Sequence, residues 1–288
     1  MKSDFFVLEG EKIRCVLCPN KCLLDEGGFG ACKVRMRKDG KIVNYYDGII
    51  SATNLDPIEK KPLYRFMPGS KIFSIGFFGC TLNCKFCQNH TISQINSEAS
   101  ANILKNKKYS PKEIVNYLIK NNLPSIAFTY SEPTLYFEWV LETSQLCRKN
   151  GIKTVLVTNG YLNEEPAKIL LEYIDAANID LKSAKDEFYV KICSGRIEPV
   201  KKFIEIAFEK KVHIEITTLV IPQTNDKIEE CVEITKFIAN LSENIPFHIS
   251  RYFPNYKFNI SETPKETIYR WRDEAKKRLK FVYMGNMF

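Results

Sequence analysis

The sequence predicts an α/β fold with a largely parallel sheet, because strand and helix patterns alternate along most of the chain. From residue 71 onward, short apolar runs rich in β-branched residues alternate with amphipathic stretches. Six or more such units in succession are typical of parallel β/α architectures. With 288 residues the chain can bury a full core, so we expect one large domain and a small module.

The expected strands are short apolar segments without helical spacing. They are 72–78, 125–129, 153–157, 176–181, 213–220, 247–250 and a last short strand, 280–284. The segment 213–220 has the strongest β-branched content, and the segment 72–78 runs directly into a cysteine-rich loop. Each strand is therefore expected to deliver the residues that follow it to one edge of the sheet.

Segments with helical spacing separate these strands. The expected helices are one opening at Ser110, then 135–149, 163–171, 187–191, 199–210, 226–241 and one opening at Thr263. Ser110–Glu113 and Thr263–Glu266 both have the sequence of a capping box with proline at the first helical position. Periodicity alone leaves a doubly wound open sheet as an alternative to a curved, partial (β/α) barrel.

Cysteine usage sets the amino-terminal part of the chain apart. Seven of the ten cysteines fall into two clusters, at 15–32 and 80–87. In a chain without a signal peptide or a long apolar span, such clusters favour metal binding over disulfides. Only three histidines are present, so we expect thiolate chemistry. We predict a cysteine-rich metal-binding module over 1–70 and a core over 71–288.

Cys80, Cys84 and Cys87 have the spacing C-x3-C-x2-C. A structural zinc site needs four protein ligands, and a 4Fe–4S cubane takes one cysteine per iron. Three thiolates would leave one iron open to a small molecule. The alternative is a zinc knuckle completed by a distant ligand such as His90, although zinc motifs more often pair their cysteines.

The amino-terminal cysteines form a second candidate site. Cys15, Cys18, Cys22 and Cys32 have the spacing C-x2-C-x3-C-x9-C among glycine-rich turns. Four thiolates can close a tetrahedral zinc site, which would stabilise a segment too small to fold alone. A second 4Fe–4S cluster acting as an electron relay is the alternative, and both assignments stay open here.

Polar residues recur at the carboxyl ends of the predicted strands, where parallel β/α folds place their sites. The residues in these positions are Glu132, Asn159, Asp180, Lys182 and His248, together with the three cysteines of the 80–87 loop. Each of them alone could have a structural role. Their recurrence at one edge favours a shared site, although no catalytic residue can be assigned from the sequence.

The three-cysteine loop and Ser131-Glu132-Pro133 resemble motifs of the radical S-adenosylmethionine (AdoMet) superfamily. The resemblance implies a partial (β/α)6 TIM-like barrel, in which the three cysteines bind a 4Fe–4S cluster and AdoMet binds the open iron. It also implies that Glu132 and its backbone accept hydrogen bonds from the AdoMet ammonium, and that the Phe86 backbone contacts adenine. Tyr130 and Ser131 replace the two glycines of the family motif.

Glycyl-radical-enzyme activases, such as those of pyruvate formate-lyase, carry similar motifs in the same order. The matching residues are Thr158-Asn159-Gly160, Asp180-Leu181-Lys182 and Pro246-Phe247-His248, which implies that Asn159, Asp180, Lys182 and His248 lie near AdoMet. A more extensive resemblance is to the AmmeMemoRadiSam system radical AdoMet enzymes. It includes the cysteine motif at 15–32, the run Asp56–Leu63 and the segment Arg251–Tyr256.

These resemblances imply an enzyme that cleaves AdoMet to a 5′-deoxyadenosyl radical and abstracts hydrogen from a substrate, for example a protein or peptide. An electron donor such as flavodoxin or ferredoxin is the expected partner. An RNA-modifying radical AdoMet enzyme and a non-enzymatic iron–sulfur or RNA-binding protein are the alternatives. We expect a cytoplasmic protein without a membrane partner, because no signal peptide or long apolar stretch is recognised. The net charge of +8 is spread along the chain, so a nucleic-acid partner is not expected.

Overall fold

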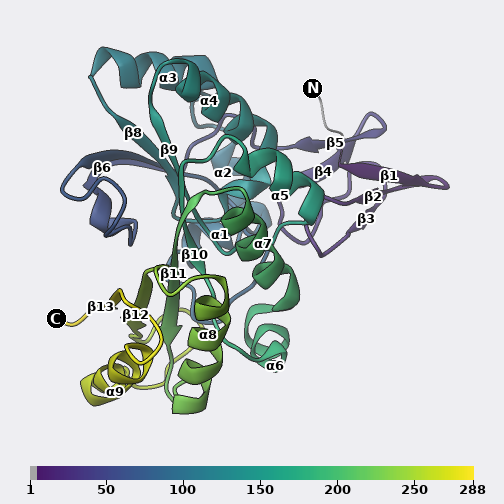
Figure 1. Ribbon diagram of the computed structural model, residues 1–288. Coiled ribbons are helices and arrows are strands. Elements are labelled where there is room, and N and C mark those ends of the chain that lie inside the picture. The colour runs from purple at the N-terminus through teal and green to yellow at the C-terminus, as the bar shows by residue number, and fades with distance from the viewer. Residues whose placement is uncertain (1–4) are drawn as a thin grey trace.

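The computed structural model describes residues 5–288, apart from the side chains of 97–99, and contains an eight-stranded sheet (Figure 1). Its spatial order is β13-β12-β11-β10-β9-β8-β7-β6. The strands β7 to β13 pair in parallel, whereas β6 pairs antiparallel with β7. Sequential parallel strands joined by helices confirm the predicted α/β fold of the partial-barrel type.

The elements of this sheet follow the expected alternation. The strands are β6 (Ala52–Pro57), β7 (Lys71–Gly76), β8 (Ser125–Thr129), β9 (Lys153–Thr158), β10 (Ala176–Asp180), β11 (His213–Val220), β12 (Phe247–Arg251) and β13 (Val282–Gly285). The helices are α1 (His90–Ser93), α2 (Ser97–Ile103), α3 (Pro111–Lys120), α4 (Phe137–Lys149), α5 (Glu164–Leu171), α6 (Asp186–Phe188), α7 (Glu198–Glu209), α8 (Ile228–Leu241) and α9 (Lys265–Ala275). No helix in the described part of the chain is long and apolar enough to cross a membrane.

The two predicted capping boxes have different outcomes. At α3, the Ser110 hydroxyl accepts from the Glu113 amide and the Glu113 carboxylate accepts from the Ser110 amide, as predicted. At α9 the prediction is wrong, because Pro264 occupies the N-cap position without a side-chain cap. The Thr263 hydroxyl instead donates to the Val220 carbonyl at 2.6 Å, which ties the start of α9 to the end of β11.

The cysteine-rich segment forms small antiparallel sheets beside the large sheet, drawn in purple in Figure 1. Its strands are β1 (Phe6–Glu9), β2 (Lys12–Cys15) and β3 (Leu23–Leu24), followed by the pair β4 (Arg35–Lys38) and β5 (Lys41–Asn44). Two contacts attach it to α4. Arg35 Nη2 lies 2.8 Å from the Glu138 carboxylate, and the rings of Phe5 and Phe137 meet edge to face at 4.8 Å.

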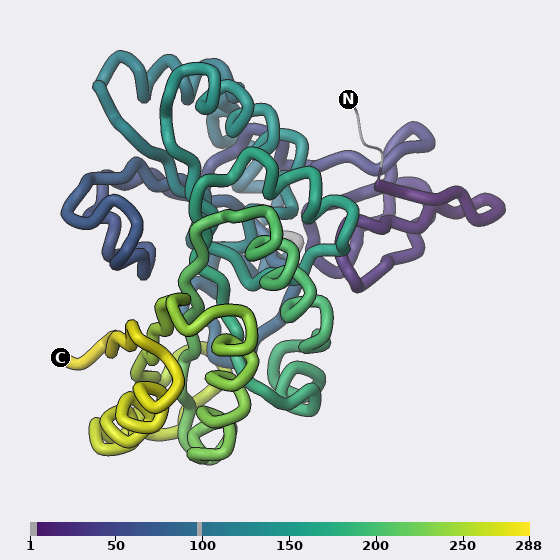
Figure 2. Tube along the Cα trace, viewed as in Figure 1, coloured from purple at the N-terminus to yellow at the C-terminus, as the bar shows by residue number. Residues whose placement is uncertain are grey.

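The two faces of the large sheet have different covers. Phe73, Phe128 and Leu156 belong to the large apolar cluster that includes the helices. On the opposite face, which we call the inner face, Ile58 and Leu63 pack with residues of four strands, namely Ile72, Ala127, Val155 and Ala176. We call residues 58–67 the floor segment, because they cover this face; Figure 2 shows their course beside the sheet.

Strand pairing includes residues 52–57 in the large sheet, although the sequence pattern assigned them to the cysteine-rich module. All six residues of β6 pair with β7, from Ala52 opposite Gly76 to Pro57 opposite Lys71. Four of the six are exposed, so this edge strand lacks the apolar run by which buried strands are recognised. The domain boundary at residue 70 stays a prediction.

Candidate functional site

The three-cysteine loop follows β7 at the carboxyl end of the sheet and is held by backbone hydrogen bonds. The Asn83 amide donates to the Cys193 carbonyl at 2.8 Å, which joins the loop to the segment after β10. Cys84 is buried, and Cys80 and Cys87 are half-buried. The three thiols are therefore presented by a loop whose backbone is already fixed.

The surroundings of these thiols favour their protonated form when no metal is bound. Burial, followed by the nearby Glu132 charge, raises the pKa of Cys80 well above its usual value. A hydrogen bond with Cys193, together with burial, does the same to the pKa of Cys84, and burial raises the pKa of Cys87. Metal binding at this loop therefore releases protons, because thiolates are the binding form.

Lys182 and Asp180 lie beside this loop, as the strand-end rule predicts. Lys182 Nζ is 2.8 Å from Asp180 Oδ2 and 5.9 Å from the centre of the Phe86 ring. Burial would lower the pKa of Lys182, but the charge of Asp180 and its hydrogen bond oppose burial, and this pKa lies well above its usual value. The structure thus places a charged ammonium group beside the three-cysteine loop.

Glu132 is fully buried, and its carboxylate accepts four hydrogen bonds from other groups of the protein. Its carboxylate accepts from the amide and hydroxyl of Thr134 at 3.1 and 2.7 Å, from Thr158 Oγ1 at 2.7 Å and from the Asn159 amide at 2.9 Å. Burial raises the pKa of Glu132, and these hydrogen bonds oppose the rise. The carboxylate joins the turn after β8 to the turn after β9, and its contact with AdoMet stays a prediction.

Asn159 links the turn after β9 directly to the cysteine loop. Its Nδ2 donates to Cys80 Sγ at 3.4 Å and to Thr81 Oγ1 at 3.1 Å. Its Oδ1 accepts from the Tyr161 amide at 2.8 Å, which fixes the orientation of the side-chain amide. The predicted neighbourhood of Asn159 and Cys80 is therefore present, with an N–H group aimed at a ligand sulfur.

His248 does not lie at the carboxyl end of its strand, contrary to prediction. It is the second residue of β12, three residues before the end of the strand. Its Nε2 lies 2.6 Å from Glu215 Oε2, and His213 Nε2 lies 3.0 Å from the other oxygen. The sequence pattern ended this strand at residue 250, and it could not show that His248 pairs with Glu215 on the inner face.

Glu215 was not recognised as a site residue from the sequence. Besides both histidines, it accepts from the amides of Tyr64 and Arg65 at 3.0 and 2.8 Å, so it anchors the floor segment. Burial would raise the pKa of Glu215, but the hydrogen bonds from His213 and His248 outweigh it and lower this pKa to about 2. Glu215 is therefore an ionised group inside the fold.

A second polar cluster surrounds Asp56 and was also missed as a site. Its Oδ2 is 2.8 Å from Lys61 Nζ and 3.0 Å from both Ser74 Oγ and the Tyr130 hydroxyl. Burial opposes ionisation, yet the Lys61 contact lowers the pKa of Asp56 to about 2. Lys61 Nζ also lies 4.7 Å from the centre of the Tyr130 ring. The only sequence signal was the run Asp56–Leu63, which carried no assigned role.

The amino-terminal cysteines come together in the cysteine-rich segment. Cys15, Cys18 and Cys32 are buried and Cys22 is half-buried, and all four line one cavity. Burial raises the pKa of Cys15, Cys18 and Cys32. Across the described residues, no three Cys, His, Asp or Glu side chains are close enough to hold a single metal ion as they stand.

Comparison with known proteins places these residues in a family. The sequence profile of the radical SAM superfamily matches residues 74–235, which include the loop, Glu132, Asn159 and Lys182. This chain belongs to the radical SAM superfamily. The cofactors of that family are a 4Fe–4S cluster and AdoMet.

Two relatives and one solved structure illustrate the range of similarity. An uncharacterized protein of Methanocaldococcus jannaschii is 38% identical over 283 residues, which are 97% of this chain and 83% of that protein. Pyruvate formate-lyase 1-activating enzyme of Escherichia coli K12 is 27% identical over 190 residues, 63% of this chain and 75% of that enzyme.

Streptococcus suis SuiB bound to S-adenosylmethionine aligns with a TM-score of 0.56 and 18% identity, over 73% of this chain and 49% of SuiB. This chain thus spans about half the length of SuiB, and the likeness shows the fold alone. The donor set of the loop fits the family's cluster. It offers three thiols, and the Asn159 amide donates to one of them.

Proposed function

We propose that the protein cleaves AdoMet reductively and uses the resulting 5′-deoxyadenosyl radical to abstract a hydrogen atom from a substrate. The observation that carries the proposal is the meeting of the three-cysteine loop with Lys182, Asp180 and Asn159 at the carboxyl ends of β7, β9 and β10. When bound, the 4Fe–4S cluster supplies one electron to AdoMet.

The chain's own residues would prepare this site in three ways. Asn159 donates a hydrogen bond to Cys80 and so orients a cluster ligand and reduces its charge density. The Lys182–Asp180 pair offers one cation and one anion beside the loop for the ribose and methionyl groups of AdoMet. Burial of Cys84 and Phe86 keeps water from this part of the site.

For the substrate we propose a protein or peptide, as for an activating enzyme. The support is the similarity to pyruvate formate-lyase 1-activating enzyme, together with the resemblance of Thr158-Asn159-Gly160 and Asp180-Leu181-Lys182 to activase motifs. The test is deuterium transfer into 5′-deoxyadenosine from polypeptides labelled at the glycine α-carbon. Transfer from a labelled small metabolite with none from polypeptides would contradict this substrate class while leaving the proposed radical chemistry intact.

The radical chemistry itself is tested with Cys84→Ala. Reconstituted anaerobically and reduced with dithionite, the wild-type protein should convert AdoMet to 5′-deoxyadenosine and methionine. The variant should form no 5′-deoxyadenosine, because the cluster loses one of its three thiolates. Cys147→Ala, a buried cysteine outside both cysteine clusters, is the matched control and should keep the activity. Full activity in Cys84→Ala would contradict the proposed function.

A further inference from the structure

The cavity of the amino-terminal cysteines contains features that suit an anionic metal centre. Arg35 lines the cavity together with all four cysteines. Its Nε is buried and has no hydrogen-bond partner among the described residues, although its Nη2 pairs with Glu138. A buried N–H group without an acceptor is costly, and an acceptor within reach of Nε would remove that cost.

Two backbone amides already point at sulfurs of this site. The Ala31 amide donates to Cys22 Sγ at 3.3 Å, and the Arg35 amide donates to Cys32 Sγ at 3.4 Å. A Cβ atom added to Gly30 would lie 3.6 Å from each of these sulfurs, so the backbone approaches them closely. Hydrogen bonds to sulfur stabilise thiolates and tune the potential of iron–sulfur clusters.

The four thiols line one cavity and are not gathered around a single point. Zinc requires all its sulfurs about 2.3 Å from one point. No three metal-binding side chains of the described residues meet that requirement, either here or at the loop of Cys80, Cys84 and Cys87. Four thiols around one cavity match the number of ligands of a cubane, which takes one cysteine per iron.

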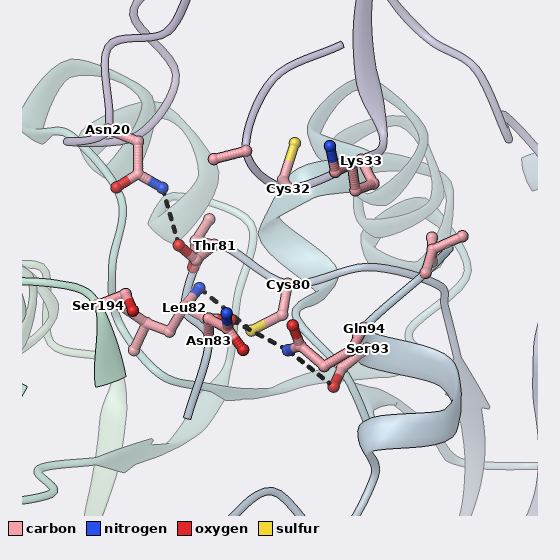
Figure 3. A pocket seen from close by; sticks show the side chains of 12 residues that line it. Asn20, Cys32, Lys33, Cys80, Thr81, Leu82, Asn83, Ser93, Gln94 and Ser194 are labelled. Carbon is pink, nitrogen blue, oxygen red and sulfur yellow. Dashed lines mark hydrogen bonds between the residues drawn. The ribbon is translucent and has the colours of Figure 1, made fainter. Parts of the chain in front are cut away.

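The site of the amino-terminal cysteines is in direct contact with the three-cysteine loop. Gly79 has a φ of +79°, and a Cβ there would lie 2.2 Å from Val34 Cγ2 and 2.7 Å from the Cys32 carbonyl oxygen. Asn20 Nδ2 donates to the Thr81 carbonyl at 2.8 Å. A cavity of about 290 Å³ is lined by both Cys32 and Cys80, as Figure 3 shows. The two cysteine sets are thus neighbours in space.

We propose that Cys15, Cys18, Cys22 and Cys32 hold a second 4Fe–4S cluster that relays electrons to the catalytic cluster. The proposal rests on the proposed function, because the electron is used there. A low-potential one-electron carrier reduces the second cluster, which passes that electron to the catalytic cluster. One electron leaves the carrier for each AdoMet cleaved. Cys22, the half-buried ligand, marks the side nearest solvent.

Metal analysis of the full-length reconstituted protein tests the second cluster. We expect about eight iron and about eight sulfide per chain and no stoichiometric zinc, since each cubane holds four of each. Cys84→Ala should keep a reducible 4Fe–4S signal in its electron paramagnetic resonance spectrum while losing AdoMet cleavage. About four iron with about one zinc in the wild type would overturn the proposal and leave the proposed function standing.

The relay is tested by comparing two reductants. Cys22→Ser should lower the rate of flavodoxin-driven AdoMet cleavage at least tenfold relative to its dithionite-driven rate, because dithionite reduces the catalytic cluster directly. Cys231→Ser, a buried cysteine outside both sites, should leave this ratio unchanged. An unchanged ratio in Cys22→Ser would overturn the relay. Absence of AdoMet cleavage by the wild type with either reductant would instead overturn the proposed function.

Discussion

Glu215 shows how one buried carboxylate can organise residues that are far apart in the sequence. It is fully buried, 151 positions from Tyr64, and each of its oxygens accepts one histidine N–H and one backbone amide. Because four donors surround it, the ionised carboxylate is favoured and contributes to the stability of the fold. The pKa near 2 indicates the pH range in which that contribution is lost.

We predict that Glu215→Gln lowers the free energy of unfolding at pH 7 by about 3 kcal/mol. The native pKa of Glu215 is about 2, below its usual 4.5, and each unit of difference corresponds to roughly 1.4 kcal/mol. In the wild type this contribution is complete above about pH 4.5 and falls as the pH drops through about 2. The contribution of Glu215 is measured as the free energy of unfolding in urea at a series of pH values between 7 and 2.

In the variant, the free energy of unfolding should change less between pH 4.5 and pH 2 than in the wild type, because the titrating group is gone. Glu209→Gln, at an exposed position, is the control and should keep the wild-type pH profile. A variant with wild-type stability and pH profile would contradict the role of Glu215 as a buried ionised anchor.

Residues of the site were predictable where their position followed from strand order. Asn159 and Lys182 follow consecutive strands, so the strand-end rule placed them beside the cysteine loop. The pairing of Glu215 with His248 depends on which face of β11 and β12 each side chain occupies. Both faces of these strands are buried, so the sequence lacks the alternation of apolar and polar residues that would reveal the inner face.

At the level of elements, buried strands were predicted better than the edge strand. The segments 125–129 and 213–220 match β8 and β11, because apolar and β-branched residues fill them. The exposed strand β6 was not predicted, since Asn54 and Asp56 interrupt any apolar pattern. Thr263 was misassigned as an N-cap because its acceptor, the Val220 carbonyl, belongs to a different element.

The contact between the cysteine loop and the cysteine-rich segment leads to a prediction for Gly79→Ala. Placing alanine in a left-handed backbone conformation alone lowers the free energy of unfolding by roughly 1 kcal/mol. We expect Gly79→Ala to lower it by well over this amount, because the new Cβ would also lie only 2.2 Å from Val34 Cγ2. The free energy of unfolding, measured with urea, should be lower than in the wild type. The iron content after reconstitution should be lower as well.

The matched control for this change is Gly40→Ala. Gly40 also has a positive φ, +70°, but a Cβ there would meet nothing within 4 Å. It should therefore show only the conformational cost and keep the wild-type iron content. Equal losses of stability in the two variants would contradict the importance of the close approach at Gly79.

At the scale of the whole molecule, the charge balance bears on the electron donor. The chain has 42 lysines and arginines against 34 acidic residues. An excess of positive charge attracts acidic electron carriers. Dissolved salt screens this attraction, and the Debye length is about 8 Å at an ionic strength of 0.15 M. If the electron donor is an acidic flavodoxin or ferredoxin, as expected from the resemblance, this charge would steer it toward the protein.

We predict that flavodoxin-driven AdoMet cleavage falls several-fold between about 50 and about 300 mM salt under conditions in which reduction limits the rate. Dithionite-driven cleavage should change by less than about twofold over this range, and serves as the control. The measurement is the initial rate of 5′-deoxyadenosine formation with each reductant. A flavodoxin-driven rate independent of salt would contradict steering by the net charge.

The floor segment connects strands of the large sheet that are not neighbours. It starts beside Asp56 on β6, its Pro62 carbonyl accepts from Asn178 on β10, and its amides at 64 and 65 bond to Glu215 on β11. In the described part of the chain β6 and β13 are the two edges of the sheet, so these contacts join strands that are not neighbours in the sheet order. We therefore expect that inserting or deleting one residue between Asp56 and Tyr64 would break the contact with Asn178 or the contacts with Glu215 and so loosen several strands at once.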